Sequence, residues 1–515
     1  MATEPSLAFL QSRVLLVRLA IALLVLRTVA LAQALSLEEA STRDLQLAFR
    51  QNNLTSRQLT NFYLNRIRML NPLLRGVIEV NPDALRQADR ADRERKAKPY
   101  GSLSAVHGIP ILLKDNIATK DKMNTTAGSF ALLGSVVPRD AGVVARLRRA
   151  GAVLLGKASL SEWAYYRSSG APSGWCARSG QGKNPYNLSA DPCGSSSGSA
   201  ISVAANMGAV SLGTETDGSI LCPSSSNSLV GIKPTLGLTS RGGVVPITPR
   251  QDTVGPMCRT VADAVDVLDV IVGFDPYDAK ATREASKYIP RGGYKQFLKA
   301  DGLKGKRLGI VKPFFDFSSG SPVAKAFESH FNILRKQGAV LVMELANFSE
   351  VYSDSSEGVA MSAEFKLALN AYLQDLAVSP VRSLADVIAF NNRHKHVEKI
   401  DEYGQDSFLA SQATNGIDKT VKSAWLNMTR LSRDGFEKLM RQNKLDALVT
   451  PYSMVTSVLA IGGFPGISVP AGYDEDGVPF GICFGGLRGS EPTLIEIAYG
   501  FEQATKVRKP PSFKR

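Results

Sequence analysis

The sequence has few of the residues on which common catalytic and structural sites depend. Its 515 residues include only 4 histidines and 5 cysteines. The cysteines form no C-x-x-C pair and are odd in number, which argues against a zinc site and against a dense disulfide framework. Four histidines leave few candidates for a histidine base. We therefore expect no structural metal.

Acidic residues are also scarcer than basic ones. The chain carries 61 Lys+Arg against 47 Asp+Glu, a net charge of +14. Most basic residues are mixed with acidic ones, as on solvated surfaces, so the charge does not indicate a nucleic-acid partner. The C-terminus has an acid-free basic cluster that is too short to be a binding domain, formed by Lys506, Arg508, Lys509, Lys514 and Arg515.

The N-terminus resembles a targeting segment. Residues 5–37 contain no acidic residue, and the apolar stretch 19–26 follows two arginines and precedes a small-x-small signal at residues 30–32. These features predict a cleaved export signal over residues 1–34. Arg27 interrupts the apolar run, so a plastid or mitochondrial transit peptide remains an alternative. A membrane-spanning helix is not expected, because it needs about 20 uninterrupted apolar residues.

Glycosylation sequons give mild support to the secretory route. A sequon places its asparagine in a surface loop when the protein is secreted. Five are present, more than the two or three expected by chance in about this length. They begin at Asn53, Asn124, Asn187, Asn347 and Asn427.

The remaining chain predicts an α/β protein. Short apolar strands are expected at residues 108–114, 153–155 and 209–213, and a late hairpin at 467–473 and 478–484. Helices are expected at 83–98, 143–150 and 199–207, and residues 275–460 are expected to be mostly helical. Strands that alternate with helices indicate a sheet covered by helices. We predict one large domain over residues 36–509, followed by a basic tail at 510–515.

The glycine- and serine-rich segment 193–231 contains two candidate nucleophiles. Residues 194–198 match the G-x-S-x-G pattern, with Ser196 as the nucleophile. That pattern requires a strand immediately before it. Residues 188–192 are polar and include a proline, which a central strand excludes. The elbow interpretation of Ser196 is therefore rejected.

Ser219 is the stronger candidate. It follows the predicted strand 209–213 through a turn that ends in Gly218. A glycine there allows successive backbone N–H groups to converge on a developing oxyanion. The base could be Lys114, at the end of the apolar strand 108–114, because desolvation lowers the pKa of a lysine. A solvated lysine at a strand end is the alternative from this segment alone.

Seven distinctive motifs follow one another along the chain. They are GIPILLKDN (108–116), GSSSGSA (194–200), GTETDGSI (213–220), VGIKPTLGL (230–238), DTVGPMCRT (252–260), GFPGISVPAG (463–472) and FEQAT (501–505). In this order and spacing they resemble the amidase signature family, from about residue 37 to 509. GTETDGSI, with Asp217 where many members have glycine, is most similar to the branch of plant amidases and bacterial peptide amidases.

The resemblance implies a fold and a catalytic site. The fold would be a single large α/β domain with a central mixed β-sheet covered by helices on both faces. The triad would consist of Ser219 as nucleophile, Ser195 as a bridging serine that follows a cis peptide bond, and Lys114 as base. Ser196 would hydrogen-bond the lysine. The oxyanion hole would be the backbone N–H groups of Thr216, Asp217, Gly218 and Ser219. No metal or organic cofactor would be required.

The resemblance also implies a function. The expected reaction is hydrolysis of a linear carboxamide to a carboxylic acid and ammonia or an amine, with a peptide, aryl or fatty acyl amide as substrate. The region 275–460 and the aromatic segment 163–166 are expected to shape the acyl pocket. Alternatives are the amidotransferase subunit that acts on misacylated tRNA and a non-catalytic amidase-like binding protein. The oligomeric state is left open.

One departure from the family pattern lies beside the nucleophile. Many members have arginine two residues after it, whereas this chain has Leu221, followed by Cys222. Recognition of charged substrates through that arginine is therefore in doubt. Cys193 and Cys222 lie near the site in sequence, and we interpret them as structural thiols.

Overall fold

The computed structural model describes residues 36–98, 101–343, 345 and 349–513. The chain divides into two compact units, Met1–Ala40 and Ser41–Arg515, and all described helices and strands belong to the second unit. The predicted leader, residues 1–34, and the sequon at Asn347 lie outside the described residues. No helix in the described ranges is long and apolar enough to cross a bilayer.

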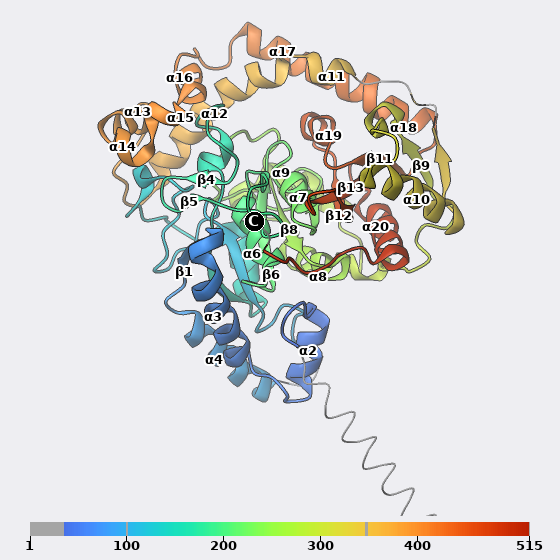
Figure 1. Cartoon of the computed structure of the whole chain (residues 1–515). Coiled ribbons are helices and arrows are strands. Elements are labelled where there is room, and N and C mark those ends of the chain that lie inside the picture. Colours follow the sequence, from blue (N-terminus) through green and yellow to red (C-terminus); the bar gives the residue numbers. More distant parts are fainter. Residues whose placement is uncertain (1–35, 99–100, 344, 346–348, 514–515) are drawn as a thin grey trace, which may run out of the picture. The chain divides into compact units, whose positions relative to one another are not determined.

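The second unit is built around a mixed sheet of eleven strands (Figure 1). Their order across the sheet is β1-β3-β2-β6-β8-β7-β12-β13-β11-β9-β10. The short β4 (Trp175–Cys176) and β5 (Gly180–Gln181) pair separately. The strands of the large sheet are β1 (Val77–Val80), β2 (Pro110–Lys114), β3 (Val153–Ala158), β6 (Val210–Glu215), β7 (Val230–Lys233), β8 (Thr253–Cys258), β9 (Arg307–Ile310), β10 (Val340–Val342), β11 (Ala447–Pro451), β12 (Gly466–Tyr473) and β13 (Pro479–Gly485).

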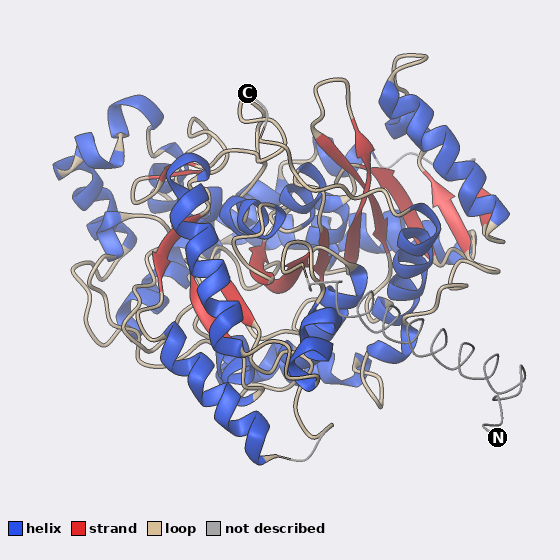
Figure 2. Ribbon diagram, turned by 60° about the horizontal axis from the view of Figure 1, so that its bottom comes forward, coloured by secondary structure: helices blue, strands red, loops and turns tan. Residues whose placement is uncertain are grey.

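Helices lie on both sides of this sheet, which confirms the expected fold class (Figure 2). All residues of β2, β3 and β6 are buried, as their apolar sequences predict. The helices are α2 (Thr42–Arg50), α3 (Ser56–Leu74), α4 (Ala84–Ala97), α5 (Gly142–Arg149), α6 (Ser197–Ala204), α7 (Leu221–Ser226), α8 (Val261–Ile271), α9 (Ala279–Ala285), α10 (Pro322–Lys336), α11 (Ser349–Ser353), α12 (Ser356–Asp375), α13 (Leu384–Arg393), α14 (Lys395–Glu398), α15 (Ile400–Tyr403), α16 (Asp406–Gln412), α17 (Lys419–Arg430), α18 (Lys438–Gln442), α19 (Thr456–Gly462) and α20 (Glu491–Thr505).

The structure corrects the sequence-based prediction in the second half of the chain. Residues 275–460 contain many helices, and α12 and α17 lie side by side there (Figure 1). They also contain three strands, β9, β10 and β11, which the prediction missed. Strands this short have no periodicity that separates them from buried helical turns, so only pairing across the sheet defines them. The predicted late hairpin is correct, because β12 and β13 pair antiparallel within the large sheet.

Two neighbouring parallel strands position the candidate site. In the register of β2 with β6, Leu113 lies opposite Leu212. β6 extends to Glu215, past the predicted strand end at residue 213. The carboxyl ends of adjacent parallel strands lie at the same edge of a sheet, where α/β proteins commonly place their ligand sites. Lys114, which ends β2, is therefore brought next to the segment that leads into Ser219.

Candidate active site

Lys114 is fully buried and has three hydrogen-bond acceptors around its ammonium group. Its Nζ lies 2.7 Å from Ser195 Oγ, 3.0 Å from Thr214 Oγ1 and 3.1 Å from the Thr214 carbonyl oxygen. Desolvation lowers its pKa to about 7, although the nearby charges of Glu215 and Asp252 act in the opposite direction. The structure therefore excludes a solvated lysine here, and a sizeable neutral fraction is present near pH 7.

Ser195 lies between Lys114 and the turn that carries Ser219. The peptide bond between Gly194 and Ser195 is cis, as the family resemblance implied. Ser195 is buried, and its carbonyl oxygen accepts the Ser161 N–H at 3.0 Å. Its hydroxyl oxygen is thus held within hydrogen-bonding distance of the Lys114 nitrogen.

Ser219 is placed by a sharp turn between β6 and α7. Gly218 has φ +80°, a left-handed conformation that glycine adopts without steric cost. The Ser196 N–H donates to the Ser219 carbonyl oxygen at 3.2 Å, which joins the two serine segments. Within the described part of the chain, the Ser195 and Ser219 hydroxyls are not hydrogen-bonded to each other. Catalytic hydrogen bonds are often longer before substrate binds, so this geometry agrees with a relay that closes on binding.

The turn leaves a set of backbone donors unused. Across the described residues, the N–H groups of Thr216, Asp217, Gly218 and Ser219 donate to no protein acceptor. The next two N–H groups are capped by the Glu215 carboxylate, at 2.6 Å from Ile220 N and 2.9 Å from Leu221 N. Successive free N–H groups in a turn form an anion-binding concavity, so this segment can hold an oxyanion.

Neighbouring carboxylates hold this turn in shape. The Thr216 hydroxyl donates to Asp252 Oδ1 at 2.6 Å, and Asp252 Oδ2 accepts the Ile247 and Thr248 N–H groups. Burial raises the pKa of Glu215 and of Asp252, and backbone hydrogen bonds act in the opposite direction. Sequence reasoning missed Glu215 and Asp252 as supporting residues. Their only signal was their place in the motifs GTETDGSI and DTVGPMCRT.

Ser196 has a different role from the one that the resemblance implied. Its hydroxyl donates to the Thr214 carbonyl oxygen at 3.0 Å and accepts the Thr214 N–H at 3.2 Å. The three hydrogen bonds of Lys114 go to Ser195 and Thr214, so the expected bond from Ser196 to the lysine is replaced by bonds through Thr214. Thr214 was missed because it was assigned to a turn, whereas it belongs to β6, the strand beside Lys114.

The two cysteines beside the site form a disulfide. Cys193 and Cys222 are bonded, with their Cα atoms 5.9 Å apart. Their interpretation as structural thiols was therefore wrong. The odd number of cysteines and the 29-residue separation gave no pairing signal, and only the packing of α7 against the loop before Ser195 brings the sulfurs together. Cys176, Cys258 and Cys483 are free and buried.

A second pair of carboxyl groups, Asp217 and Glu357, belongs to or lies near the turn of residues 216–219. Asp217 Oδ2 accepts the Ser457 hydroxyl at 2.7 Å, and Glu357 Oε1 accepts Gln251 Nε2 at 2.5 Å. Burial and the charge of Asp217 raise the pKa of Glu357 to about 8. Burial also raises the pKa of Asp217. The side chain of Asp217 thus adds an acidic group to a turn in which only its backbone N–H was expected to act.

The aromatic segment 163–166 packs against the helical region. Trp163 is buried, and its ring centroid lies 5.6 Å from that of Phe408 on α16. The Tyr166 ring lies 4.6 Å from the Phe365 ring on α12. Trp163 is therefore part of the packing between this segment and α16, and the prediction that the segment shapes an acyl pocket stays a prediction.

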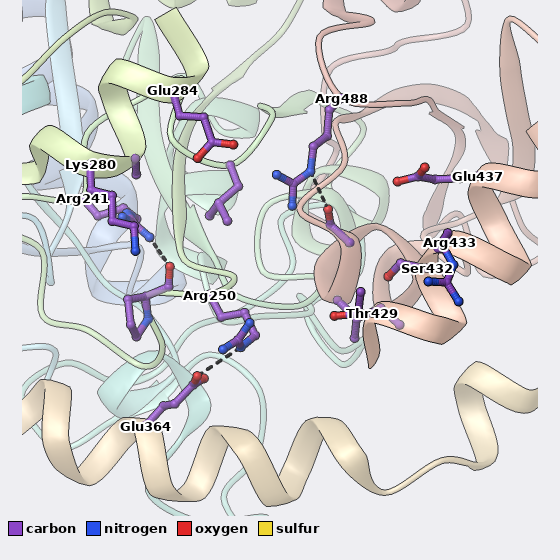
Figure 3. A pocket seen from close by; sticks show the side chains of 15 residues that line it. Arg241, Arg250, Lys280, Glu284, Glu364, Thr429, Ser432, Arg433, Glu437 and Arg488 are labelled. Carbon is purple, nitrogen blue, oxygen red and sulfur yellow. Dashed lines mark hydrogen bonds and ion pairs between the residues drawn. The ribbon is translucent and has the colours of Figure 1, made fainter. Parts of the chain in front are cut away.

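A cavity of about 690 Å³ is lined in part by residues of α9, α12, α17 and α19 (Figure 3). Its lining includes five cationic side chains and three glutamates. Arg250 pairs with Glu364 at 3.0 Å, and Arg488 Nε donates to the Gly462 carbonyl oxygen. Ile461 and Gly462, at the end of α19, line the cavity, whereas Ser457 near the start of α19 contacts Asp217. One short helix therefore connects the cavity wall to the turn that carries Ser219.

The described ranges hold no group of three or more His, Cys, Asp or Glu side chains that could bind a metal ion. His107 Nε2 pairs with Glu94 at 3.0 Å, and His330 Nε2 contacts the Ala471 carbonyl oxygen at 2.6 Å. His107 precedes β2, at the opposite end of that strand from Lys114, and His330 lies on α10. The described geometry thus offers a lysine as the base.

Comparison with known proteins agrees with this geometry. The family model described as Amidase matches residues 58–461. A probable amidase of Arabidopsis thaliana is 60% identical over 487 residues, covering 94% of this chain and 93% of that protein. The native peptide amidase of Stenotrophomonas maltophilia has a structure with TM-score 0.86 and 43% identity, covering 93% of this chain and 99% of that chain. A glutamyl-tRNA(Gln) amidotransferase component of Thermoanaerobacter pseudethanolicus is 31% identical, covering 93% of this chain and 99% of that protein.

Proposed function

Because the chain belongs to the amidase family, we propose that it is a serine hydrolase of linear carboxamides. One observation carries this proposal. A buried lysine with a pKa of about 7 lies 2.7 Å from the Ser195 hydroxyl, beside the turn that presents Ser219 and four free N–H groups. This arrangement supplies a base, a proton relay, a nucleophile and an oxyanion site.

The geometry supports a defined sequence of proton transfers. Neutral Lys114 accepts the Ser195 proton while Ser195 accepts the Ser219 proton, and Ser219 Oγ attacks the amide carbon. The N–H groups of residues 216–219 stabilise the oxyanion. The relay then returns the proton to the leaving nitrogen, because an unprotonated amine is a poor leaving group. Water attacks the resulting ester by the same route and releases the carboxylic acid.

We propose amidated peptides and related linear amides as the substrate class. The relative from Stenotrophomonas maltophilia is a peptide amidase at 43% identity. The cavity at the far end of α19 offers room for the part of a substrate that extends away from Ser219. Its lining of five cationic side chains and three glutamates favours a polar chain such as a peptide over a purely apolar fatty acyl group.

The amidotransferase interpretation remains the second candidate, because one component of that enzyme is 31% identical over most of this chain. It requires partner proteins and a tRNA substrate. The higher identity to the Arabidopsis amidase favours direct hydrolysis. A non-catalytic binding protein is disfavoured because Lys114, Ser195 and Ser219 are all present in a connected arrangement.

We further propose that the protein is exported through the secretory pathway and glycosylated. The predicted leader at residues 1–34 and the sequons motivate this proposal. The Cys193–Cys222 disulfide supports it, because disulfides persist mainly in oxidising compartments. Sequencing the N-terminus of the mature protein tests it, and an uncleaved leader or a protein imported into plastids would contradict it.

Active-site labelling tests the assignment of residues. A fluorophosphonate is expected to label the full-length protein, and Ser219→Ala is expected to abolish the labelling. Ser226→Ala, on the adjoining helix α7, is the matched control and should be labelled like the wild type. Labelling that survives Ser219→Ala and disappears in Ser196→Ala would overturn the assignment.

A substrate screen tests the reaction. The wild type is expected to release ammonia from C-terminally amidated peptides faster than from arylacetamides or fatty acyl amides. A protein that hydrolyses none of them, but releases ammonia from glutamine when partner proteins and misacylated tRNA are added, would favour the amidotransferase.

A further inference from the structure

We propose that the Cys193–Cys222 disulfide positions the two catalytic serines relative to each other, so that a dithiol reductant lowers amide turnover without unfolding the protein. This inference rests on the proposed amidase function. It makes the activity of that site depend on the redox state of a disulfide that lies outside the triad.

The disulfide joins the two segments that carry the relay. Cys193 precedes Ser195 by two residues, and Cys222 follows Ser219 by three. Cys193 also has φ +54° and its N–H donates to Asp191 Oδ1 at 2.7 Å, so the loop before Ser195 is held in a specific conformation. The Cys193 carbonyl oxygen accepts the Ser197 hydroxyl at 2.6 Å, which continues the constraint into α6.

Non-covalent bonds join the same two segments and would outlast reduction. Asn227 is fully buried, and its Nδ2 donates to the carbonyl oxygens of Pro192 and Pro223, both at 2.8 Å. The Ser196 N–H donates to the Ser219 carbonyl oxygen at 3.2 Å. These bonds should keep the loops packed after the covalent link is broken. Reduction is therefore expected to loosen the site and leave the fold intact.

The relay is sensitive to such loosening. Lys114 and Ser195 are already within hydrogen-bonding distance, whereas the Ser195 and Ser219 hydroxyls are not yet bonded within the described structure. The contact between the Ser195 and Ser219 hydroxyls depends on the relative position of these two segments. The disulfide joins the same two segments. A displacement of about 1 Å between reacting groups can cost roughly a hundredfold in rate.

Cys193 and Cys222 are the two cysteines at which we expect redox chemistry in the native protein. Cys193 and Cys222 are both partly exposed, so a reductant can reach the disulfide. Cys176, Cys258 and Cys483 are buried, and burial raises the pKa of each of these thiols. Thiolates are the reactive form of cysteine, so the three buried thiols should stay inert in the native protein.

The redox step is an ordinary thiol–disulfide exchange. A thiolate of the dithiol attacks one sulfur, forms a mixed disulfide and releases the other cysteine as a thiolate. The second thiol of the reductant then displaces the remaining cysteine. The protein gains two electrons and two protons, and the dithiol is oxidised to its disulfide.

The test compares oxidised and reduced wild-type enzyme. Native protein is treated with dithiothreitol, the new thiols are alkylated, and excess reagent is removed. Mass spectrometry should show alkylation at Cys193 and Cys222 alone. We expect kcat for an amidated peptide to fall at least about tenfold, KM to change less than about threefold, and the pH profile to keep its apparent pKa. Reduction followed by reoxidation without alkylation should restore kcat.

Controls separate positioning from loss of structure and from failure of the proposed function. The double variant Cys193→Ser/Cys222→Ser should have the low kcat of the reduced enzyme and should not respond to dithiothreitol. If that variant fails to fold, the reduction and reoxidation of the wild type still decide whether the disulfide controls kcat. Any of three results would overturn the positioning role. The first is an equal kcat in the two redox forms, and the second is absence of the disulfide from the native protein. The third is a loss of near-UV circular dichroism together with activity. Oxidised protein that neither hydrolyses amides nor reacts with a fluorophosphonate would instead refute the amidase function, and this inference with it.

Discussion

Burial of Lys114 should reduce the stability of the protein in acid, and its replacement by methionine measures this effect. In the folded protein the pKa of Lys114 is about 7, whereas the ordinary value is 10.5. Methionine has a similar length, carries no charge and suits a buried position. The Lys114→Met variant should therefore be inactive in amide hydrolysis. It should also be more stable than the wild type at pH values below 10.5, where the lysine is protonated in the unfolded chain.

The sign and size follow from the two pKa values. Between the folded and the unfolded pKa, the unfolded chain binds more protons, so the stability of the wild type rises with pH. The destabilising effect of the lysine is greatest below the folded pKa and vanishes above the unfolded one. The stability gain of Lys114→Met over the wild type should be larger at pH 6 than at pH 9 by about 3 kcal/mol. The hydrogen bonds lost with the ammonium group shift the difference equally at both pH values.

Denaturant unfolding of both proteins at a series of pH values measures this difference. Lys157 and Lys233 are also buried with a pKa lowered to about 8, but they are common to both proteins and cancel. In parallel, the rate of fluorophosphonate labelling of the wild type should rise about tenfold from pH 6 to pH 8, as the neutral fraction of Lys114 grows. A stability difference that is independent of pH, or that grows with pH, would refute the assignment of a lowered pKa to Lys114.

Three further substitutions test two carboxyl groups of the site and one histidine outside it. Glu215→Gln removes the charge that most raises the pKa of Lys114, so the pH profile of labelling should shift to lower pH. The amide oxygen of the new side chain can still accept the N–H groups of Ile220 and Leu221. An unchanged profile would contradict the coupling between residues 114 and 215. Asp217→Asn removes a charge that raises the pKa of Glu357, so carbon-13 NMR of that carboxyl group should show titration at lower pH than the wild-type value of about 8; no change would mean that the two groups do not interact. His330→Gln should lower the thermal midpoint because the residue is buried and contacts the Ala471 carbonyl oxygen, but the labelling rate at the optimal pH should remain within about twofold; a loss of labelling in a folded variant would show that a histidine takes part in catalysis.

Much of the site was predictable because its chemistry follows local patterns. The apolar strand that ends in Lys114, the glycine turn before Ser219 and the serine run around Ser195 are each contained in a few consecutive residues. The family motifs added the cis peptide before Ser195, and the structure has it. Local apolar patterns also predicted the strands β2, β3 and β6, although they did not reveal the other strands in the first half of the chain.

The incorrect predictions all concern partners that are distant along the chain. Ser196 was assigned to Lys114, yet it bonds Thr214, which lies 18 residues away in sequence. Cys193 pairs with Cys222 across 29 residues. The strands β9 and β11 are defined by pairing between segments more than a hundred residues apart, where no local pattern could indicate the partner.

Local patterns and family motifs in the sequence were thus sufficient to indicate an α/β chain and to nominate Lys114 and Ser219 as candidate base and nucleophile. Only folding buries Lys114 and lowers its pKa. The pKa of Lys114 depends on burial by residues such as Thr214, which is 100 positions away, and on the charges of Glu215 and Asp252. Desolvation and Coulomb interaction depend on distance in space, so only the packed sheet could establish the protonation state on which the chemistry depends.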